Sequence, residues 1–286
     1  MRLLPCVDSP QLSAAVEQKL NIPRRIAAEL GRSAVEIART GHYVNPAGNK
    51  VDISRLVADA GAAKRSIAPD APLPTPQRAR SSETHVQVRN ETTFEAASRF
   101  VANGMRPLAL NFANGIQAGG GFLHGARAQE EVLCRSSALY PTLLGDAMYL
   151  AHAQRPRPDS TPWAIYSPDV PVFRNDDGTP LDRPWLLSII TCAAPYAPAL
   201  GQPEAGDLLQ QRIHRVLSIA AAYAHPALVL GGWGCGAFGN DPQRTAADFR
   251  KALEGEFANT FCDVVFAIAD WSPERRFLGP FRDAFR

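Results

Sequence analysis

Two adjacent carboxylates, Glu130 and Glu131, stand shortly after three consecutive glycines, Gly119–Gly121. The apolar run at 107–110 precedes the glycines and predicts a buried strand. The spacing of apolar residues from 129 towards 144 predicts an amphipathic helix that begins at the carboxylates. Backbone N–H groups of a glycine loop suit an anion such as phosphate, and a carboxylate held beside that anion suits acid–base chemistry.

A second glycine loop, residues 234–242 (G-C-G-A-F-G-N-D-P), follows the apolar run 227–230 and precedes a predicted helix with Pro242 in its first turn. The loop also fits the G-x-G-x-x-G fingerprint of dinucleotide-binding folds. Against that interpretation, the copy leaves room for one further strand only, and the acidic residue expected about 20 positions later is missing from a strand end. A phosphate-binding loop is expected under either interpretation. A merely tight turn is the structural alternative.

Together, the two motifs resemble the bacterial type of poly(ADP-ribose) glycohydrolase, which is built on a macrodomain. The match consists of Gly119–Gly121, a gap of seven residues and Gln129-Glu130-Glu131, followed about a hundred residues later by 234–242. It extends over most of the chain, including the N-terminal helix and the segment 41–53. The resemblance implies cleavage of ribose–ribose O-glycosidic bonds, with release of ADP-ribose. No cofactor is expected. The substrate is expected to be poly(ADP-ribose) on ADP-ribosylated proteins, and the response to DNA damage is the expected setting.

By the same resemblance, Glu131 is the catalytic acid and base, and Glu130 holds the ribose hydroxyls. Neighbouring residues on a helix point about 100° apart, so the two carboxylates cannot share one role. The expected ADP-ribose-binding residues are Asn111, Asn114, Gly119, Gly120, Gly121, Gln129, Gly234, Cys235, Gly236, Ala237, Phe238 and Gly239.

Three of these residues have alternatives that the sequence leaves open. Either Asn111 or Asn114 is expected to bond a ribose hydroxyl, and both could instead form turns. Phe238 stands among glycines and could stack on the adenine or cover the adjoining ribose. Cys235 is expected to fill space, although a thiol beside a phosphate loop could be reactive. His124 and Arg127 are assigned no role.

The proposed chemistry needs one residue to work twice. Glycoside hydrolysis passes through an oxocarbenium-like state, and two carboxylates on opposite sides usually serve it. Adjacent residues of a helix do not supply that geometry. Glu131 is therefore expected to protonate the departing oxygen and then to take a proton from water. Burial, or Glu130 beside it, would favour its protonated form at the start.

Two other classes of function, besides an NAD(P)-dependent oxidoreductase, remain open. A non-catalytic macrodomain would bind ADP-ribose through the same loops and would not need Gln129-Glu130-Glu131. A hydrolase could also act on the bond between ADP-ribose and the protein.

Composition sets the cellular context. The 286 residues carry a formal net charge of +2, so we expect no binding of duplex nucleic acid. No apolar run approaches the ~20 residues of a membrane span, and the N-terminus lacks the apolar region of a signal peptide. The five cysteines are scattered without C-x-x-C, and the six histidines lack metal-ligand spacing. We therefore predict a cytoplasmic protein without a metal site.

Alternating strands and helices predict an α/β fold, a macrodomain-like mixed sheet flanked by helices on both faces. Residues 1–80 are predicted to form a mainly helical extension with a hairpin at 41–53 and a proline-rich connection at 66–82. Residues 81–286 are predicted to form the macrodomain-like catalytic core. Its predicted strands are 84–88, 107–112, 163–166, 170–174, 185–192, 227–230 and 264–269, and its helices are 93–103, 129–144, 207–223 and 241–257.

Overall fold

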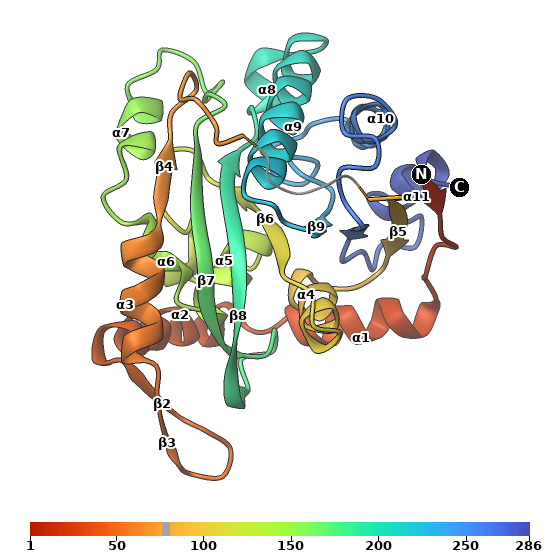
Figure 1. The fold of residues 1–286 in the computed structure, drawn as a ribbon. Coiled ribbons are helices and arrows are strands. Elements are labelled where there is room, and N and C mark those ends of the chain that lie inside the picture. Colours follow the sequence, from red (N-terminus) through yellow and green to blue (C-terminus); the bar gives the residue numbers. More distant parts are fainter. Residues whose placement is uncertain (76–80) are drawn as a thin grey trace.

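A computed structural model describes residues 1–75 and 81–286. Its main sheet has eight strands in the order β1-β5-β10-β9-β6-β8-β7-β4 (Figure 1). The bounds are β1 Arg2–Leu3, β4 Arg65–Ile67, β5 His85–Arg89, β6 Pro107–Ala113, β7 Ala164–Arg174, β8 Pro180–Ala193, β9 Ala227–Leu230 and β10 Asp263–Ala267. In this spatial order, the neighbouring strands β1, β5, β10, β9, β6 and β8 pair in parallel. Strand β7 is antiparallel to both of its neighbours, β8 and β4. The sheet is therefore mixed, as predicted.

Helices cover both faces of this sheet (Figure 1). Successive residues of β6 face opposite sides: Leu108 and Leu110 join the core under α9, α10 and α11, whereas Ala109 joins the core under α2, α4 and α5. The helices are α1 Pro10–Leu20, α2 Arg24–Thr40, α3 Ser54–Ala63, α4 Thr93–Ala102, α5 Gln129–Ser136, α6 Leu139–Leu143, α7 Ala147–Ala153, α8 Ala197–Leu200, α9 Glu204–Ala222, α10 Pro242–Glu254 and α11 Leu278–Ala284. Among the described residues, none of these helices is both long and apolar enough to cross a membrane.

The N-terminal part of the chain supplies both outer strands of the sheet. β1 pairs with β5 at one edge, and β4 pairs with β7 at the other. Between them lie α1, α2 and the small antiparallel sheet of β2 (His42–Val44) and β3 (Lys50–Asp52), the predicted hairpin. The predicted proline-rich connection begins within β4, and its residues 76–80, which adjoin the predicted domain boundary, lie outside the described residues. The division into two domains stays a prediction.

Three predicted elements differ from the structure. The helix predicted from 129 towards 144 is broken at Ser137, whose extended backbone forms a bridge with Val172 and whose hydroxyl donates to the Leu133 carbonyl at 2.7 Å. The two strands predicted within 163–174 are one strand, β7, with an irregularity between Ser167 and Val170. The strand predicted at 185–192 begins earlier, because β8 continues to Pro180 to close a hairpin with β7.

Candidate functional site

The two glycine loops meet at one edge of the sheet. β6 and β9 are parallel neighbours, with Leu108 opposite Leu228, so their carboxyl ends lie together. The loop after β6 leads to α5, and the loop after β9 leads to α10. Gln129 at the start of α5 and Gly236 of the second loop line the same cavity, about 220 Å³ in volume. The predicted motifs are thus brought together on one side of the molecule.

One carboxylate oxygen of Glu131 is fixed by a hydrogen bond, and the other has no hydrogen-bond partner in the described part of the chain. Its side chain lies in the first turn of α5, and the residue is only 8% exposed. Oε1 accepts a hydrogen bond from the Gly121 N–H at 3.0 Å. Oε2 is buried and has no partner among the described residues. A carboxyl group with one fixed and one unoccupied oxygen is suited to exchange a proton with a substrate atom.

Glu130 is buried more deeply, with 3% of its surface exposed. Its Oε2 accepts from the Asn114 N–H at 2.8 Å, and its Oε1 accepts from Asn111 Nδ2 at 3.3 Å. Burial, together with the nearby charge of Glu131, raises the pKa of Glu130 to about 8, although the Asn114 N–H opposes this shift. The two adjacent carboxyl groups therefore retain a proton between them near neutrality, and the pair does not carry two full negative charges.

The three glycines let the backbone approach these carboxylates. Gly119 and Gly120 have φ values of +71° and +57°, which side chains disfavour. A Cβ atom on Gly120 would lie 2.4 Å from Glu131 Oε1 and 2.9 Å from Glu130 Oε2. The N–H groups of Gly120 and Gly121 donate to the Gln117 carbonyl and to Glu131. The N–H groups predicted to bind an anion are thus directed at protein acceptors, and an ADP-ribose contact by these glycines stays a prediction.

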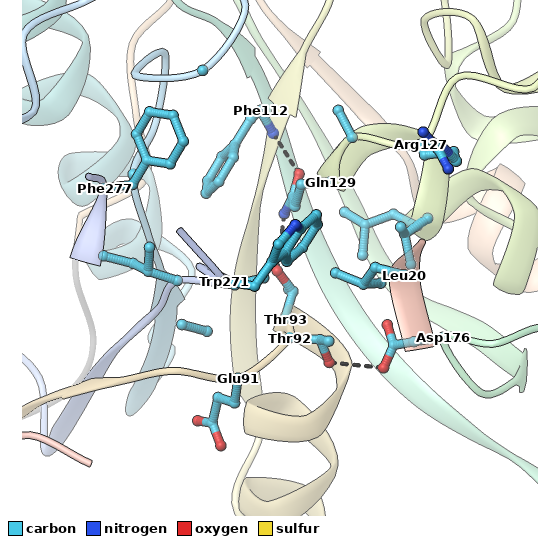
Figure 2. Close-up of a pocket in the computed structure, with 18 residues that line it drawn as sticks. Leu20, Glu91, Thr92, Thr93, Phe112, Arg127, Gln129, Asp176, Trp271 and Phe277 are labelled. Atoms are coloured by element: carbon cyan, nitrogen blue, oxygen red, sulfur yellow. Dashed lines mark hydrogen bonds between the residues drawn. The ribbon is translucent and has the colours of Figure 1, made fainter. Parts of the chain in front are cut away.

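Gln129 ties the start of α5 to the end of β6. Its side-chain oxygen accepts from the Phe112 N–H at 3.0 Å, and its amide donates to the Leu110 carbonyl at 2.8 Å and to Thr93 Oγ1 at 3.1 Å. Figure 2 shows the first of these bonds as a dashed line between Phe112 and Gln129, both of which line the cavity. Ala128 caps the helix without a side-chain hydrogen bond, so Gln129 takes over the fixing of this helix end.

The two candidate asparagines occupy different environments. Asn111 is fully buried; its Nδ2 donates to Thr191 Oγ1 at 3.1 Å as well as to Glu130, and its Oδ1 has no partner among the described residues. The Oδ1 of Asn114 instead accepts from the N–H groups of Ile116 and Gln117, at 2.9 and 3.0 Å, in a side-chain turn. Asn111 therefore keeps a free amide oxygen beside the carboxylates, and Asn114 reaches them through its backbone.

The second loop uses the N–H groups of Gly239 and Asn240 internally but leaves three others without an acceptor among the described residues. Gly234 and Gly239 have positive φ values, +76° and +64°. Asn240 Nδ2 holds the loop closed by donating to the carbonyls of Pro195 and Gly234, at 2.9 and 3.2 Å. Within the described part of the chain, the N–H groups of residues 236–238 have no hydrogen-bond acceptor. Consecutive unpaired N–H groups on a tight loop form an anion-binding concavity.

The side chains of Cys235 and Phe238 in this loop face the protein. Cys235 is buried, and burial raises the pKa of its thiol to about 12, which agrees with the space-filling interpretation. Phe238 is half-buried at the margin of the core and meets the Tyr196 ring edge-on at 5.9 Å. Its predicted contact with adenine or ribose stays a prediction. Across the described residues, no three His, Cys, Asp or Glu side chains are grouped to hold a metal ion.

Several residues of the cavity were not found from the sequence. Figure 2 shows its walls formed by Trp271 and Phe277 after β10, Glu91 and Thr92 before α4, and Asp176 from the turn between β7 and β8. Thr92 donates its hydroxyl to Asp176 Oδ2 at 2.7 Å, and burial raises the pKa of Asp176 to about 6. These residues come from segments far apart in the chain. Among them, Thr92 alone belongs to a local sequence pattern, the capping box that it forms with Glu95 at the start of α4.

The N-terminal helices support the catalytic loop, which gives Arg127 a role that the sequence did not indicate. Its Nη1 donates to Asn21 Oδ1 at 2.7 Å and to the Ile22 carbonyl at 2.9 Å, in the turn between α1 and α2. Gly31 of α2 packs so closely that an added Cβ would lie 2.6 Å from the Phe122 carbonyl oxygen. The loop carrying the glycine triplet therefore packs directly against α2.

Comparison with known proteins agrees with this geometry. The family model described as the microbial-type poly(ADP-ribose) glycohydrolase (PARG) catalytic domain matches residues 31–175. The crystal structure of PARG from Thermomonospora curvata is 37% identical, with a TM-score of 0.87, and covers 91% of this chain and 100% of that chain. The same enzyme bound to the inhibitor ADP-HPD has a TM-score of 0.84. A search of curated proteins found no match.

A second bacterial enzyme is similarly related. PARG from Deinococcus radiodurans in complex with ADP-ribose is 38% identical, with a TM-score of 0.74, and covers 82% of this chain and 98% of that chain. These matches confirm the predicted macrodomain-like fold, the predicted resemblance and the predicted class of enzyme, a glycosidase. The chain belongs to the microbial-type poly(ADP-ribose) glycohydrolase family.

Proposed function

We propose that the protein hydrolyses the ribose–ribose O-glycosidic bonds of poly(ADP-ribose) and releases ADP-ribose, with Glu131 as the general acid and base. The observation that carries this proposal is the unoccupied, buried Oε2 of Glu131. Glu131 lies two residues after Gln129, which lines one cavity together with Gly236 of the second glycine loop. A non-catalytic ADP-ribose-binding macrodomain would not need an acid held in this way.

ADP-ribose would extend across the carboxyl edge of the sheet. The N–H groups of Gly236, Ala237 and Phe238 would bind the diphosphate, in a loop shaped by Gly234, Cys235 and Gly239. The cavity walled by aromatic side chains would take the adenine, because flat apolar surfaces suit a stacked base. The distal ribose would then lie beside Glu130 and Glu131, with the other predicted ligands Asn111, Asn114, Gly119, Gly120, Gly121 and Gln129 around it.

In the reaction, Glu131 gives its proton to the departing 2′ oxygen as the bond to the anomeric carbon breaks. The diphosphate on the second glycine loop steadies the positive charge that develops on the sugar. Water then attacks the anomeric carbon and passes its proton to the Glu131 carboxylate, which restores the starting state. The raised pKa of Glu130 means that the adjacent carboxyl groups retain a proton near neutrality; the reaction starts from the state in which Glu131 carries it, and Glu130 holds the ribose hydroxyls.

The decisive variant is Glu131→Gln, which keeps the size and polarity of the side chain but removes the proton. We expect a loss of turnover of ~10³-fold or more with ADP-ribose affinity retained. Turnover is measured as ADP-ribose released from polymer-modified protein, and affinity by calorimetry. Glu29→Gln, on the exposed face of α2, is the matched control.

Four outcomes would contradict the proposal. Wild-type activity in Glu131→Gln would remove the assigned acid. Binding of ADP-ribose by an inactive wild-type protein would indicate the non-catalytic macrodomain. Binding of NAD in preference to ADP-ribose would indicate the oxidoreductase. Release of only the protein-linked unit would identify the alternative hydrolase.

We infer further that the protein acts in the cytoplasm, on polymer made during the response to DNA damage. No disulfide joins its cysteines within the described residues, which agrees with a reducing compartment. Cell fractionation and the decay of polymer after DNA damage, with and without the protein, test this setting. Unchanged decay would contradict it.

A further inference from the structure

A second cavity, about 430 Å³ in volume, lies between α2, β2 and the turn that joins β7 to β8. Its lining includes Ser33, Tyr43 and Arg174. Arg174 Nη1 donates to the carbonyl of Arg135 in the last turn of α5, so this cavity lies at the opposite end of that helix from Glu130 and Glu131. It shares no lining residue with the cavity at the glycine loops.

Arg174 is a buried cation without a carboxylate partner in the described structure. It is 7% exposed, and its guanidinium forms no ion pair there. Nη1 donates to the carbonyls of Leu30 and Arg135, at 2.9 and 3.0 Å, and Nη2 donates to Ser33 Oγ at 2.7 Å. The Nε–H has no acceptor among the described residues. A buried charge is costly unless it is paired, so this guanidinium favours an anion.

Tyr43 adds a second unsatisfied donor to the same cavity. The residue is 3% exposed, and its hydroxyl has no hydrogen-bond partner among the described residues. Glu36, the carboxylate among the lining residues, is paired with Arg39 at 2.5 Å, and its side chain is 57% exposed. The charge of Glu36 is therefore compensated and solvated, and it does not neutralise Arg174.

We propose that this cavity is a binding site for a small phosphate-bearing anion, held by Arg174, Ser33 and Tyr43. A guanidinium binds oxyanions strongly through charge-assisted hydrogen bonds. The Nε–H of Arg174, the Ser33 hydroxyl and the Tyr43 hydroxyl are donors placed around one cavity. Phosphate has more oxygen atoms than a carboxylate, so it can accept from more of these donors and should fit the cavity better. The site is separate from the one proposed for ADP-ribose.

The test is calorimetric titration of the whole protein with inorganic phosphate, at constant ionic strength and with ADP-ribose at saturation to occupy the glycine loops. Wild-type protein should bind phosphate saturably. Ser33→Asp places a carboxylate beside Arg174 and should weaken that binding at least ~10-fold, because the cation is then already paired. Arg174→Gln should abolish it. Ser98→Asp, on the exposed side of α4, should bind as the wild type does.

Ser33→Asp retains every contact that Arg174 makes to the backbone, so it tests the site even if Arg174→Gln fails to fold. Equal phosphate binding in Ser33→Asp and Ser98→Asp would overturn the proposal. So would phosphate binding that disappears when ADP-ribose is present, since the phosphate would then occupy the glycine loops. Tighter binding of acetate than of phosphate would overturn the preference for phosphate. Failure of ADP-ribose itself to bind would be seen in its own titration and would count against the proposed function instead.

Discussion

The two glycine loops look alike in the sequence, but their backbones serve different purposes. In the first loop, the N–H groups of Gly120 and Gly121 donate to protein acceptors, one of which is the carboxylate of Glu131. In the second loop, the N–H groups of residues 236–238 have no acceptor among the described residues. The first loop therefore organises the acid, and the second is open to a ligand.

The same difference explains why glycine is required at each place. A Cβ on Gly120 would lie 2.4 Å from a carboxylate oxygen, so the side chain is absent to let protein atoms approach. A Cβ on Gly236 would meet no protein atom within 4 Å. The space beside Gly236 is free for something other than the protein. Substitution of these two glycines should therefore affect different steps.

Gly120→Ala should have the larger effect, on turnover. The new methyl group must displace Glu131 Oε1, and φ at this position is +57°. Misplacement of a catalytic group by about 1 Å costs on the order of 10²-fold in rate, so we expect kcat to fall about 10²-fold. Steady-state kinetics of ADP-ribose release check this, with circular dichroism to confirm folding. A folded variant with wild-type kcat would show that the first loop does not position the acid.

The pH dependence of stability tests whether the first loop stabilises a protonated carboxyl group at Glu130. Its pKa is raised from an ordinary value of 4.5 to about 8, so the folded protein keeps a proton that the unfolded chain releases between these values. The contribution of Glu130 to the free energy of unfolding is full below pH 4.5. It falls as pH rises towards 8, because the folded state binds more protons than the unfolded state in this range. Glu130→Gln removes this contribution, since an amide stays neutral.

We therefore expect the free energy of unfolding of the wild type to fall more steeply from pH 5 to 8 than that of Glu130→Gln. The difference in slope should approach ~1.4 kcal/mol per pH unit, the limit for one proton. Urea unfolding at each pH measures it, and the exposed Glu29→Gln should keep the wild-type slope. Parallel curves for Glu130→Gln and the wild type would mean that the first loop does not stabilise a protonated carboxyl.

Much of the fold could be predicted because its signals are local. The strand Ala227–Leu230 is one uninterrupted apolar run, and α10 begins after Asp241 with Pro242 in its first turn. The break at Ser137 in the helix predicted from 129 towards 144 was not predictable in this way. The Ser137 hydroxyl competes for the helix backbone, and the bridge to Val172 depends on a strand that comes later in the chain.

The residues of the candidate site also divide into those with a local sequence signal and those without one. Glu130, Glu131 and the two loops stand in short motifs, so their proximity followed from two parallel strands ending at one edge. Trp271 and Asp176 carry no motif, and they reach the cavity only through the packing of segments after β10 and β7. Arg174 has no local signal either, because its missing anion partner is a property of the folded surroundings.

Gly236→Ala should have the smallest effect, and it should fall on binding rather than on turnover. The methyl group meets no protein atom, so folding and the position of Glu131 should not change. It would occupy space that the diphosphate is proposed to use, and we expect ADP-ribose affinity to fall about 10-fold, with kcat within about twofold of wild type. Gly61→Ala, on α3, also meets no protein atom and serves as the matched control. Unchanged affinity in Gly236→Ala, or a fall in kcat equal to that of Gly120→Ala, would remove the distinction between the two loops.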